Sequence, residues 1–283
     1  MSSDDGAKSV LGNHAILFEE HRMSTYLMPE GMRPASLDER RHFYSVEFNL
    51  GNVAAWLRER PGRTNFAVII GRHTKIFPEE YREDADTTII IDKYRNLADV
   101  RRRTLEFLPE AVYYDRNLYG VNGKKTGQEL AFDLDPENVT CPIHGSLGDK
   151  LKRGQGLGFC RIELDMVRKQ AASLHEYLEK KYSCLKIVYS GRGFHIHIFD
   201  EETYLLGEKQ RVKIAREVKK RGFAIDEWVT AGEMRLIRLP FSLHGMVSRV
   251  VLPLEKSELE RFDPINDERC LPRFLREKTT SSF

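Results

Sequence analysis

The segment that most constrains the fold of this chain is Phe194–Phe199, which reads Phe-His-Ile-His-Ile-Phe. Alternation of apolar residues with histidines is typical of a β-strand, because successive side chains of a strand point to opposite faces. Before it lie Lys186–Ser190, rich in β-branched and aromatic residues, and the glycine-containing segment Gly191–Gly193. Together these segments predict an antiparallel hairpin with His195 and His197 on one face.

The predicted hairpin also suits anion binding. A glycine turn lets backbone N–H groups approach an anion closely. Arg192 at the tip and His195 on the strand can hold phosphate oxygens through charge-assisted hydrogen bonds. The alternative is a polar, solvent-facing strand, and His197 is a better candidate for a structural role than His195.

A second alternating segment, Leu130–Asp135, carries two acidic residues. In a strand, Asp133 and Asp135 share one face, while Phe132 and Leu134 point into a core. Two close carboxylates repel each other unless cations lie between them. Hard cations such as Mg²⁺ and Mn²⁺ prefer such oxygen ligands together with substrate phosphates. The segment therefore predicts a divalent metal site, and the alternative is a solvated strand end.

Cysteine usage indicates a separate metal site. The four cysteines, at positions 141, 160, 184 and 270, do not resemble a disulfide framework. Cys141 and His144 share a ligand-x-x-ligand spacing with Cys160 and Glu163, and Zn²⁺ prefers four ligands of these types. Asp165 is the alternative to Glu163 as fourth ligand. Cys184 and Cys270 are expected to be small buried apolar residues instead.

Periodicity predicts most of the remaining elements. The predicted strands are residues 66–70, 87–91, 112–114, 234–239 and 247–252, the predicted helices are residues 14–27, 97–108, 164–182 and 208–221, and residues 117–127 are expected to form a loop. The fold class expected from these elements is α+β, a mixed but largely antiparallel sheet platform with flanking helices. Residues 1–283 are expected to form a single domain, with residues 136–165 inserted as a zinc-binding lobe.

Charge and hydropathy limit the possible partners. The net charge is only +2, so any nucleic-acid surface must be local. Basic residues cluster at Arg33, Arg40–Arg41, Arg58–Arg63, Arg101–Arg103, Lys124–Lys125 and Lys150–Arg153, although such clusters are more often solvated faces. No membrane span or targeting segment is evident, so we expect a cytoplasmic, nucleoid-associated protein with reduced thiols and no membrane partner.

Three stretches of the chain together resemble a known family: Phe132–Asp135, Tyr189–His195, and Ile225–Thr230 leading into Arg235–Gly245. Their combination and order are similar to those of the archaeo-eukaryotic primase superfamily, and within it to the small catalytic subunit of archaeal and eukaryotic DNA primase. The resemblance extends from about residue 66 to about residue 252. Archaeal members are also similar in carrying a Cys/His zinc knuckle between the first two motifs.

The resemblance implies specific roles. The metal-binding and catalytic carboxylates would be Asp133, Asp135 and Asp226, with two Mg²⁺ or Mn²⁺ ions. The nucleoside triphosphate would be held by Ser190, Arg192, His195, Arg238 and His244, together with Arg72 of the segment Ile69–Phe77. Arg235 and Arg238 lie on opposite faces of one predicted strand, and the family pattern selects Arg238. The zinc would be structural, with Cys141, His144, Cys160 and Glu163 as its ligands.

The function implied is that of a DNA primase catalytic subunit, which makes short RNA or DNA primers on a single-stranded DNA template. Nucleoside triphosphates would be its substrates and a large primase subunit its partner. Three alternatives remain: a stand-alone primase-polymerase or repair polymerase of the same superfamily, a non-catalytic nucleic-acid-binding subunit, and a metal-dependent nuclease. The chain also departs from the family pattern, because its turn, Ser190–His195, is one residue shorter than usual. Only a single helix is expected between Phe199 and Asp226, where many archaeal relatives carry a larger insert.

Overall fold

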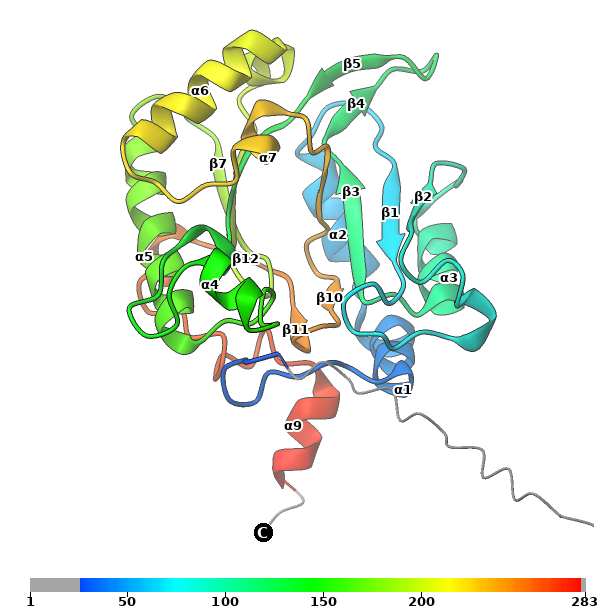
Figure 1. The fold of residues 1–283 in the computed structure, drawn as a ribbon. Helices are drawn as coiled ribbons and strands as arrows, with labels where there is room; N and C mark the ends of the chain where they lie inside the picture. The colour runs from blue at the N-terminus through cyan, green and yellow to red at the C-terminus, as the bar shows by residue number, and fades with distance from the viewer. Residues whose placement is uncertain (1–25, 281–283) are drawn as a thin grey trace, which may run out of the picture.

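The computed structural model describes residues 26–280, and two four-stranded sheets lie beside each other at its centre (Figure 1). The first sheet has the strand order β2 (Thr88–Ile91), β1 (Phe66–Ile69), β3 (Ala111–Asp115), β9 (Leu236–Arg238). The second has the order β12 (Leu252–Leu254), β7 (Leu185–Tyr189), β8 (Phe194–Ile198), β6 (Leu130–Leu134). Two small ribbons pair β4 (Asn117–Tyr119) with β5 (Lys125–Gln128) and β10 (Leu243–His244) with β11 (Arg249–Val250).

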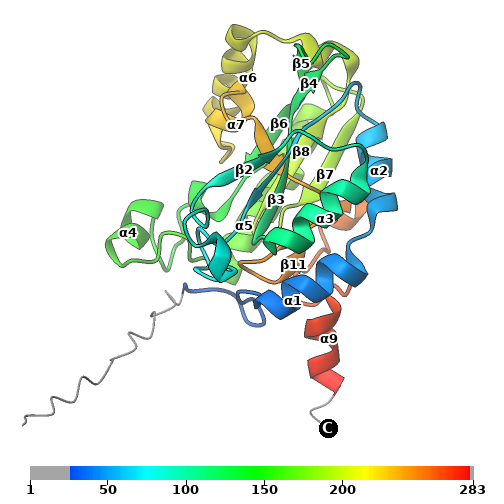
Figure 2. The same cartoon turned by 90° about the vertical axis from the view of Figure 1, so that its right-hand side faces the viewer.

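Helices flank the sheets (Figure 2). They are α1 (Leu37–His42), α2 (Leu50–Arg58), α3 (Leu97–Phe107), α4 (Leu147–Lys152), α5 (Arg161–Leu178), α6 (Glu208–Lys220), α7 (Glu227–Ala231), α8 (Lys256–Leu259) and α9 (Arg273–Thr280), with a π-helical turn at Phe43–Glu47. Short 3₁₀ turns lie at Glu79–Tyr81, Pro136–Asn138 and Glu201–Leu205. Within residues 26–280, no helix combines the length and the apolar character needed to cross a membrane.

The second sheet has two chemically different faces. Phe132 and Leu134 of β6 and Ile196 of β8 pack, with their neighbours, against apolar residues of α5 in the larger core. Because side chains alternate along a strand, Asp133 and His195 lie on the opposite face. The two residues are direct partners in the antiparallel register of β6 and β8. The alternation that predicted the two strands therefore also separates the core from the polar face.

The first sheet is arranged in the same way. Val68 and Tyr114 belong to a second core that includes residues of the π-helical turn, α2 and α3. Tyr113 of β3 points to the other face, where it pairs with Arg238 of β9 in an antiparallel register. The polar faces of both sheets thus border one space, and they supply the side chains of the candidate site.

The predicted strands and helices are largely confirmed, with three corrections, and one prediction lies almost wholly outside the described residues. Instead of one mixed platform there are two sheets, and every strand pair within residues 26–280 is antiparallel. The loop expected at residues 117–127 is the β4–β5 hairpin. Residues 247–252 form parts of two short strands, β11 and β12, rather than one. The helix expected at residues 14–27 lies outside the described residues except for Tyr26 and Leu27, which are not helical.

Several residues of the predicted basic clusters are buried rather than solvated. Arg40 is inaccessible to solvent and donates hydrogen bonds to the backbone carbonyls of Ile70 and Leu108. Arg60 and Lys150 are also buried, each in an ion pair with a glutamate. These cations stabilise the fold and do not contribute to a nucleic-acid surface.

Candidate active site

The carboxylates of the candidate site come from β6 and α7. Asp133 lies on β6 and Asp135 directly follows that strand. Asp226 caps the N-terminus of α7, where its side chain accepts a hydrogen bond from the Trp228 N–H at 2.8 Å. The backbone N–H of Asp226 donates to the carbonyl of Asp133 at 2.8 Å. This bond fixes the third carboxylate beside the first two.

The electrostatics of these carboxylates fit a divalent cation site. Burial, followed by the Asp133 and Glu137 carboxylates, raises the pKa of Asp135 well above its usual value. Burial also raises the pKa of Asp226. Burial alone would raise the pKa of Asp133 as well, but the adjacent His195 imidazole holds that pKa below its usual value. Carboxylates crowded in this way are stabilised by a cation between them, and their oxygens are the ligands that Mg²⁺ and Mn²⁺ prefer.

The glycine turn brings the second sheet's hairpin against the carboxylates. The Gly193 N–H donates to Ser190 Oγ at 3.1 Å, and the Ser190 N–H donates to the Gly193 carbonyl at 2.9 Å. A Cβ atom on Gly193 would lie 2.1 Å from the Leu134 carbonyl oxygen and 2.5 Å from an Asp135 carboxylate oxygen. Only glycine therefore allows the turn to approach the end of β6 this closely.

Arg238 and His244 reach the same space from the other side. The Arg238 guanidinium lies 4.9 Å from the centre of the Tyr113 ring and donates to the Tyr113 hydroxyl at 3.1 Å. Arg235, in contrast, pairs with Asp115 at 2.8 Å, as the opposite faces of one strand require. Burial, followed by the positive charges of Arg238 and Arg192, lowers the pKa of His244 well below its usual value. His244 is therefore neutral at neutral pH.

All nine residues predicted to bind catalytic metal or nucleotide line one cavity of about 350 Å³ between the two sheets, which we call the central cavity. They are Asp133, Asp135, Asp226, Ser190, Arg192, His195, Arg238, His244 and Arg72. Arg72 lies near the rim, where its guanidinium donates to the Asp86 carbonyl at 2.8 Å and to Thr88 Oγ1 at 3.2 Å. The structure thus brings together residues that are up to 172 positions apart in the sequence (244 minus 72).

Arg192 differs from the other cations because its charge is already neutralised. Its guanidinium donates to Glu137 Oε1 at 2.6 Å and lies 5.4 Å from the centre of the Phe159 ring. Only 9% of the Arg192 side chain is exposed. No pattern in the sequence indicated this ion pair.

Several buried nitrogen atoms of residues that border the cavity have no hydrogen-bond partner among the described residues. They are Arg192 Nε, His195 Nδ1, Arg238 Nη1 and His244 Nδ1. Buried polar atoms without partners are costly, and in a cavity they fit a ligand rich in acceptor oxygens. A cavity lined by carboxylates together with Arg and His side chains suits a metal-bound phosphate compound.

Sequence reasoning missed two buried glutamates near the cavity. Glu110 accepts hydrogen bonds from the backbone of His73 and Thr74, and its Oε1 lies 2.6 Å from His73 Nδ1. Glu129 lies 2.6 Å from His197 Nδ1 and pairs with Arg60. Both acids directly precede a buried strand, which is the one signal that could have indicated them. His197 is fully buried, in agreement with its predicted structural role.

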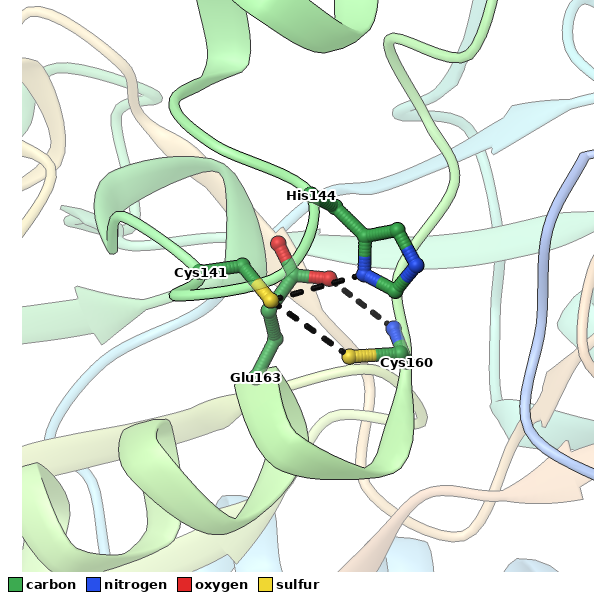
Figure 3. A group of neighbouring side chains, drawn as sticks. All are labelled: Cys141, His144, Cys160 and Glu163. Atoms are coloured by element: carbon green, nitrogen blue, oxygen red, sulfur yellow. Dashed lines mark hydrogen bonds between the residues drawn. The ribbon is translucent and has the colours of Figure 1, made fainter.

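The predicted zinc ligands form a compact cluster (Figure 3). The ligand atoms of Cys141, His144, Cys160 and Glu163 all lie within 4.8 Å of one another. Cys141 Sγ lies 3.4 Å from His144 Nδ1 and 3.8 Å from Cys160 Sγ. Two Zn–S bonds of about 2.3 Å at a tetrahedral angle place their sulfur atoms about 3.8 Å apart, so the spacing of the two thiols fits zinc.

Local backbone structure explains how the cluster assembles. Cys141 and Gly145 exchange two backbone hydrogen bonds, at 2.9 and 3.0 Å, and this tight loop holds His144 beside Cys141. Cys160 precedes α5, and its N–H donates to Glu163 Oε2 at 2.9 Å. The alternative ligand Asp165 lies outside the cluster and pairs with Arg168 at 3.5 Å.

The chain is similar in sequence to proteins described as DNA primase small subunits or as resembling them. A protein of Archaeoglobus fulgidus described as an uncharacterized DNA primase small subunit-like protein is 50% identical over 267 residues, which cover 88% of this chain and 94% of that protein. The DNA primase small subunit PriS of Pyrobaculum calidifontis is 25% identical over 218 residues, which cover 59% of this chain and 67% of that protein. No family model matches the chain.

Among solved structures, the polymerase domain of Mycobacterium tuberculosis Ligase D in complex with DNA has a similar fold. The TM-score is 0.51 at 12% sequence identity, and the match covers 87% of this chain and 88% of that domain.

Proposed function

Because this chain belongs to the archaeo-eukaryotic primase superfamily, among proteins related to the DNA primase small subunit, we propose that it is a template-directed nucleotidyltransferase. Its substrates are nucleoside triphosphates and its template is single-stranded DNA, on which it makes short RNA or DNA primers. A large primase subunit is the expected partner, and the nucleoid in the cytoplasm is the expected place of action. The observation that carries the proposal is the central cavity, in which three carboxylates lie beside Ser190 and several Arg and His side chains.

The reaction proposed is an in-line displacement at phosphorus. The 3′-hydroxyl of one nucleotide attacks the α-phosphate of the next, a new P–O bond forms, and the bond between the α- and β-phosphates breaks. Pyrophosphate leaves, and the hydroxyl proton is lost to solvent. Two Mg²⁺ or Mn²⁺ ions, when bound, activate the hydroxyl and neutralise the charge that develops on the phosphate oxygens.

The residues that line the central cavity have two different roles in the proposed reaction. Asp133, Asp135 and Asp226 hold the two ions. The triphosphate is held by Ser190 and the backbone of its turn, together with Arg72, Arg192, His195, Arg238 and His244. Because these donors are fixed by the two sheets before the substrate arrives, they need little reorganisation in the transition state.

The proposal is tested by primer synthesis on single-stranded DNA with labelled nucleotides. Asp133→Ala and Asp135→Ala should each lower incorporation by at least about hundredfold, because loss of one ligand disrupts the metal pair. Asp84→Ala removes an exposed carboxylate outside the cavity and should leave incorporation unchanged. Circular dichroism should show that all three variants are folded.

The same assay separates the alternatives. A metal-dependent nuclease would shorten the labelled DNA and incorporate nothing, and a non-catalytic binding subunit would do neither. Substantial incorporation by a folded Asp133→Ala, Asp135→Ala double variant would show that the carboxylates have been given the wrong role.

A further inference from the structure

A second pocket adjoins the central cavity. It has a volume of about 550 Å³. Asp135 and Asp226 line both spaces, so ions held by these carboxylates are accessible from the two sides. In an in-line displacement the attacking and leaving oxygens lie on opposite sides of the phosphorus atom. A second pocket that shares the carboxylates is therefore in the correct place for the nucleotide that supplies the attacking hydroxyl.

The two pockets differ in their content of basic side chains. The central cavity is lined by six Arg or His side chains, whereas no basic residue is found among the described residues that line the second pocket. Its charged side chains are the carboxylates of Asp135, Glu137 and Asp226. Without Arg, Lys or His among its described lining residues, this pocket lacks the groups that hold a triphosphate, and it suits the uncharged part of a nucleotide, its sugar and base.

The other walls of the second pocket are apolar. Leu147 and Leu151 come from α4, and Leu157 follows that helix. Tyr26 comes from the segment before α1. Leu151 is 60% exposed, an unusual position for leucine on a polar helix. Leu151 also lies against Gly156, where a Cβ atom would come within 2.6 Å of its methyl group. These residues form a surface on which a sugar and base can be buried.

We propose that the second pocket binds the 3′-terminal nucleoside of the growing chain, or the first nucleoside when synthesis begins without a primer. This inference rests on the proposed function. It assigns to α4, within the zinc-binding lobe, a direct contact with the chain that is being extended. The incoming triphosphate lies in the central cavity, and the metal-binding carboxylates separate the two nucleotides.

The test compares Leu151→Glu with Leu205→Glu. Both substitutions place a carboxylate at an exposed leucine, but Leu205 is 77% exposed and borders a different pocket, near the β4–β5 hairpin. Two affinities are measured by fluorescence anisotropy with Mn²⁺ present. One is for a primer–template whose primer lacks the terminal 3′-hydroxyl, and the other is for a labelled nucleoside triphosphate.

Leu151→Glu should weaken binding of the primer–template about tenfold or more, because it removes an apolar contact and adds a fourth carboxylate to the pocket. It should leave triphosphate affinity within about twofold, and Leu205→Glu should change neither. Leu151→Met should retain wild-type affinity for the primer–template. Equal thermal unfolding midpoints would show that the lobe stays folded.

Unchanged primer–template affinity in Leu151→Glu would overturn this inference, as would a selective loss of triphosphate affinity. Neither result depends on chemistry, because the primer cannot be extended. The proposed function is judged separately by incorporation with the wild-type chain, and its failure would leave the binding comparison interpretable.

Discussion

At the scale of single residues, the arginines of the central cavity differ in how many hydrogen bonds and ion pairs they already make within the protein. Arg192 is paired with Glu137, and Arg72 donates to the Asp86 carbonyl and to Thr88. Arg238 lies over the Tyr113 ring and donates to its hydroxyl, and its Nη1 atom has no hydrogen-bond partner among the described residues. Arg238 is therefore the cation most available to a phosphate group.

Arg238→Ala should consequently weaken triphosphate binding by about 1.5–3 kcal/mol, the usual contribution of a hydrogen bond to a charged group. Template binding should change little. The matched control is Arg235→Gln, which removes the other guanidinium of the same segment, one that faces Asp115 instead of the cavity. Isothermal titration calorimetry gives both affinities. A loss of DNA affinity with intact triphosphate affinity would instead place Arg238 on a DNA surface.

Residues on regular alternating strands were predictable from the sequence alone. Asp133, Asp135 and His195 followed from alternation, since a strand has only two faces. Asp226 and His244 come from separate elements, and only the family resemblance connected them with the others. Buried polar residues such as Glu110 and Glu129 follow no periodic pattern. Their position directly before a buried strand is the one local signal, and their partners are distant in sequence.

At the scale of elements, residues 136–165 contain little regular structure around the cluster of Cys141, His144, Cys160 and Glu163. Apart from the short α4, they contain only turns before α5 begins at Arg161. Lys150 is buried and lies 2.7 Å from Glu163 Oε1. Two thiolates, a carboxylate and Zn²⁺ carry a net charge of −1, which the Lys150 ammonium would compensate.

Protein purified without added metal should contain about one zinc per chain, since a four-ligand structural site is closed. Cys141→Ser and Cys160→Ser should each lose the zinc and lower the thermal unfolding midpoint by several degrees or more, because metal binding contributes to folding. Cys184→Ser is the control, since Cys184 lies outside the cluster. Elemental analysis and calorimetry provide the two measurements. Zinc that persists in the Cys141→Ser, Cys160→Ser double variant would contradict the assignment.

Elements with a clear apolar period were predicted within a few residues, for example α5 and β8. The β4–β5 hairpin was not, because β5 reads Lys-Thr-Gly-Gln and offers no apolar alternation. Backbone hydrogen bonds hold this hairpin together, and such bonds can form between most residue types.

At the scale of the whole molecule, a buried ionic network connects the two sheets. Glu129 accepts a hydrogen bond from Tyr114 of the first sheet at 2.9 Å and lies 2.6 Å from His197 Nδ1 of the second. Its other oxygen lies 2.5 Å from Arg60 Nε, and both side chains of this pair are almost fully buried. Removing one partner of a buried pair typically costs about 3–5 kcal/mol, because the other charge is left unpaired.

Glu129→Gln should therefore lower the free energy of unfolding by about 3–5 kcal/mol at pH 7, measured in denaturant. Burial would raise the pKa of Glu129, but Arg60 and His197 lower it to about 2. A carboxyl with a lowered pKa stabilises the fold above its unfolded pKa, near 4.5, and this stabilisation is lost as the pH falls towards 2. The difference between wild type and Glu129→Gln should shrink over that range, whereas Glu202→Gln, an exposed control, should differ from wild type at no pH.

The number of sheets was beyond the reach of the sequence. Strand periodicity shows which faces are buried, but not which strands pair, and the pairing of β3 with β9 joins segments more than one hundred residues apart. The polar face of each strand was predicted, whereas the cavity that the two faces border was not.

The ion pair between Arg192 and Glu137 links the central cavity to the second pocket. Arg192 borders the central cavity and Glu137 the second pocket. A triphosphate that takes Arg192 as a partner leaves Glu137 with an uncompensated charge, so the second pocket becomes more negative. By thermodynamic linkage the effect is reciprocal. Under the proposed function, a triphosphate in the central cavity would thus favour the sugar and base of a nucleotide in the second pocket over its phosphates.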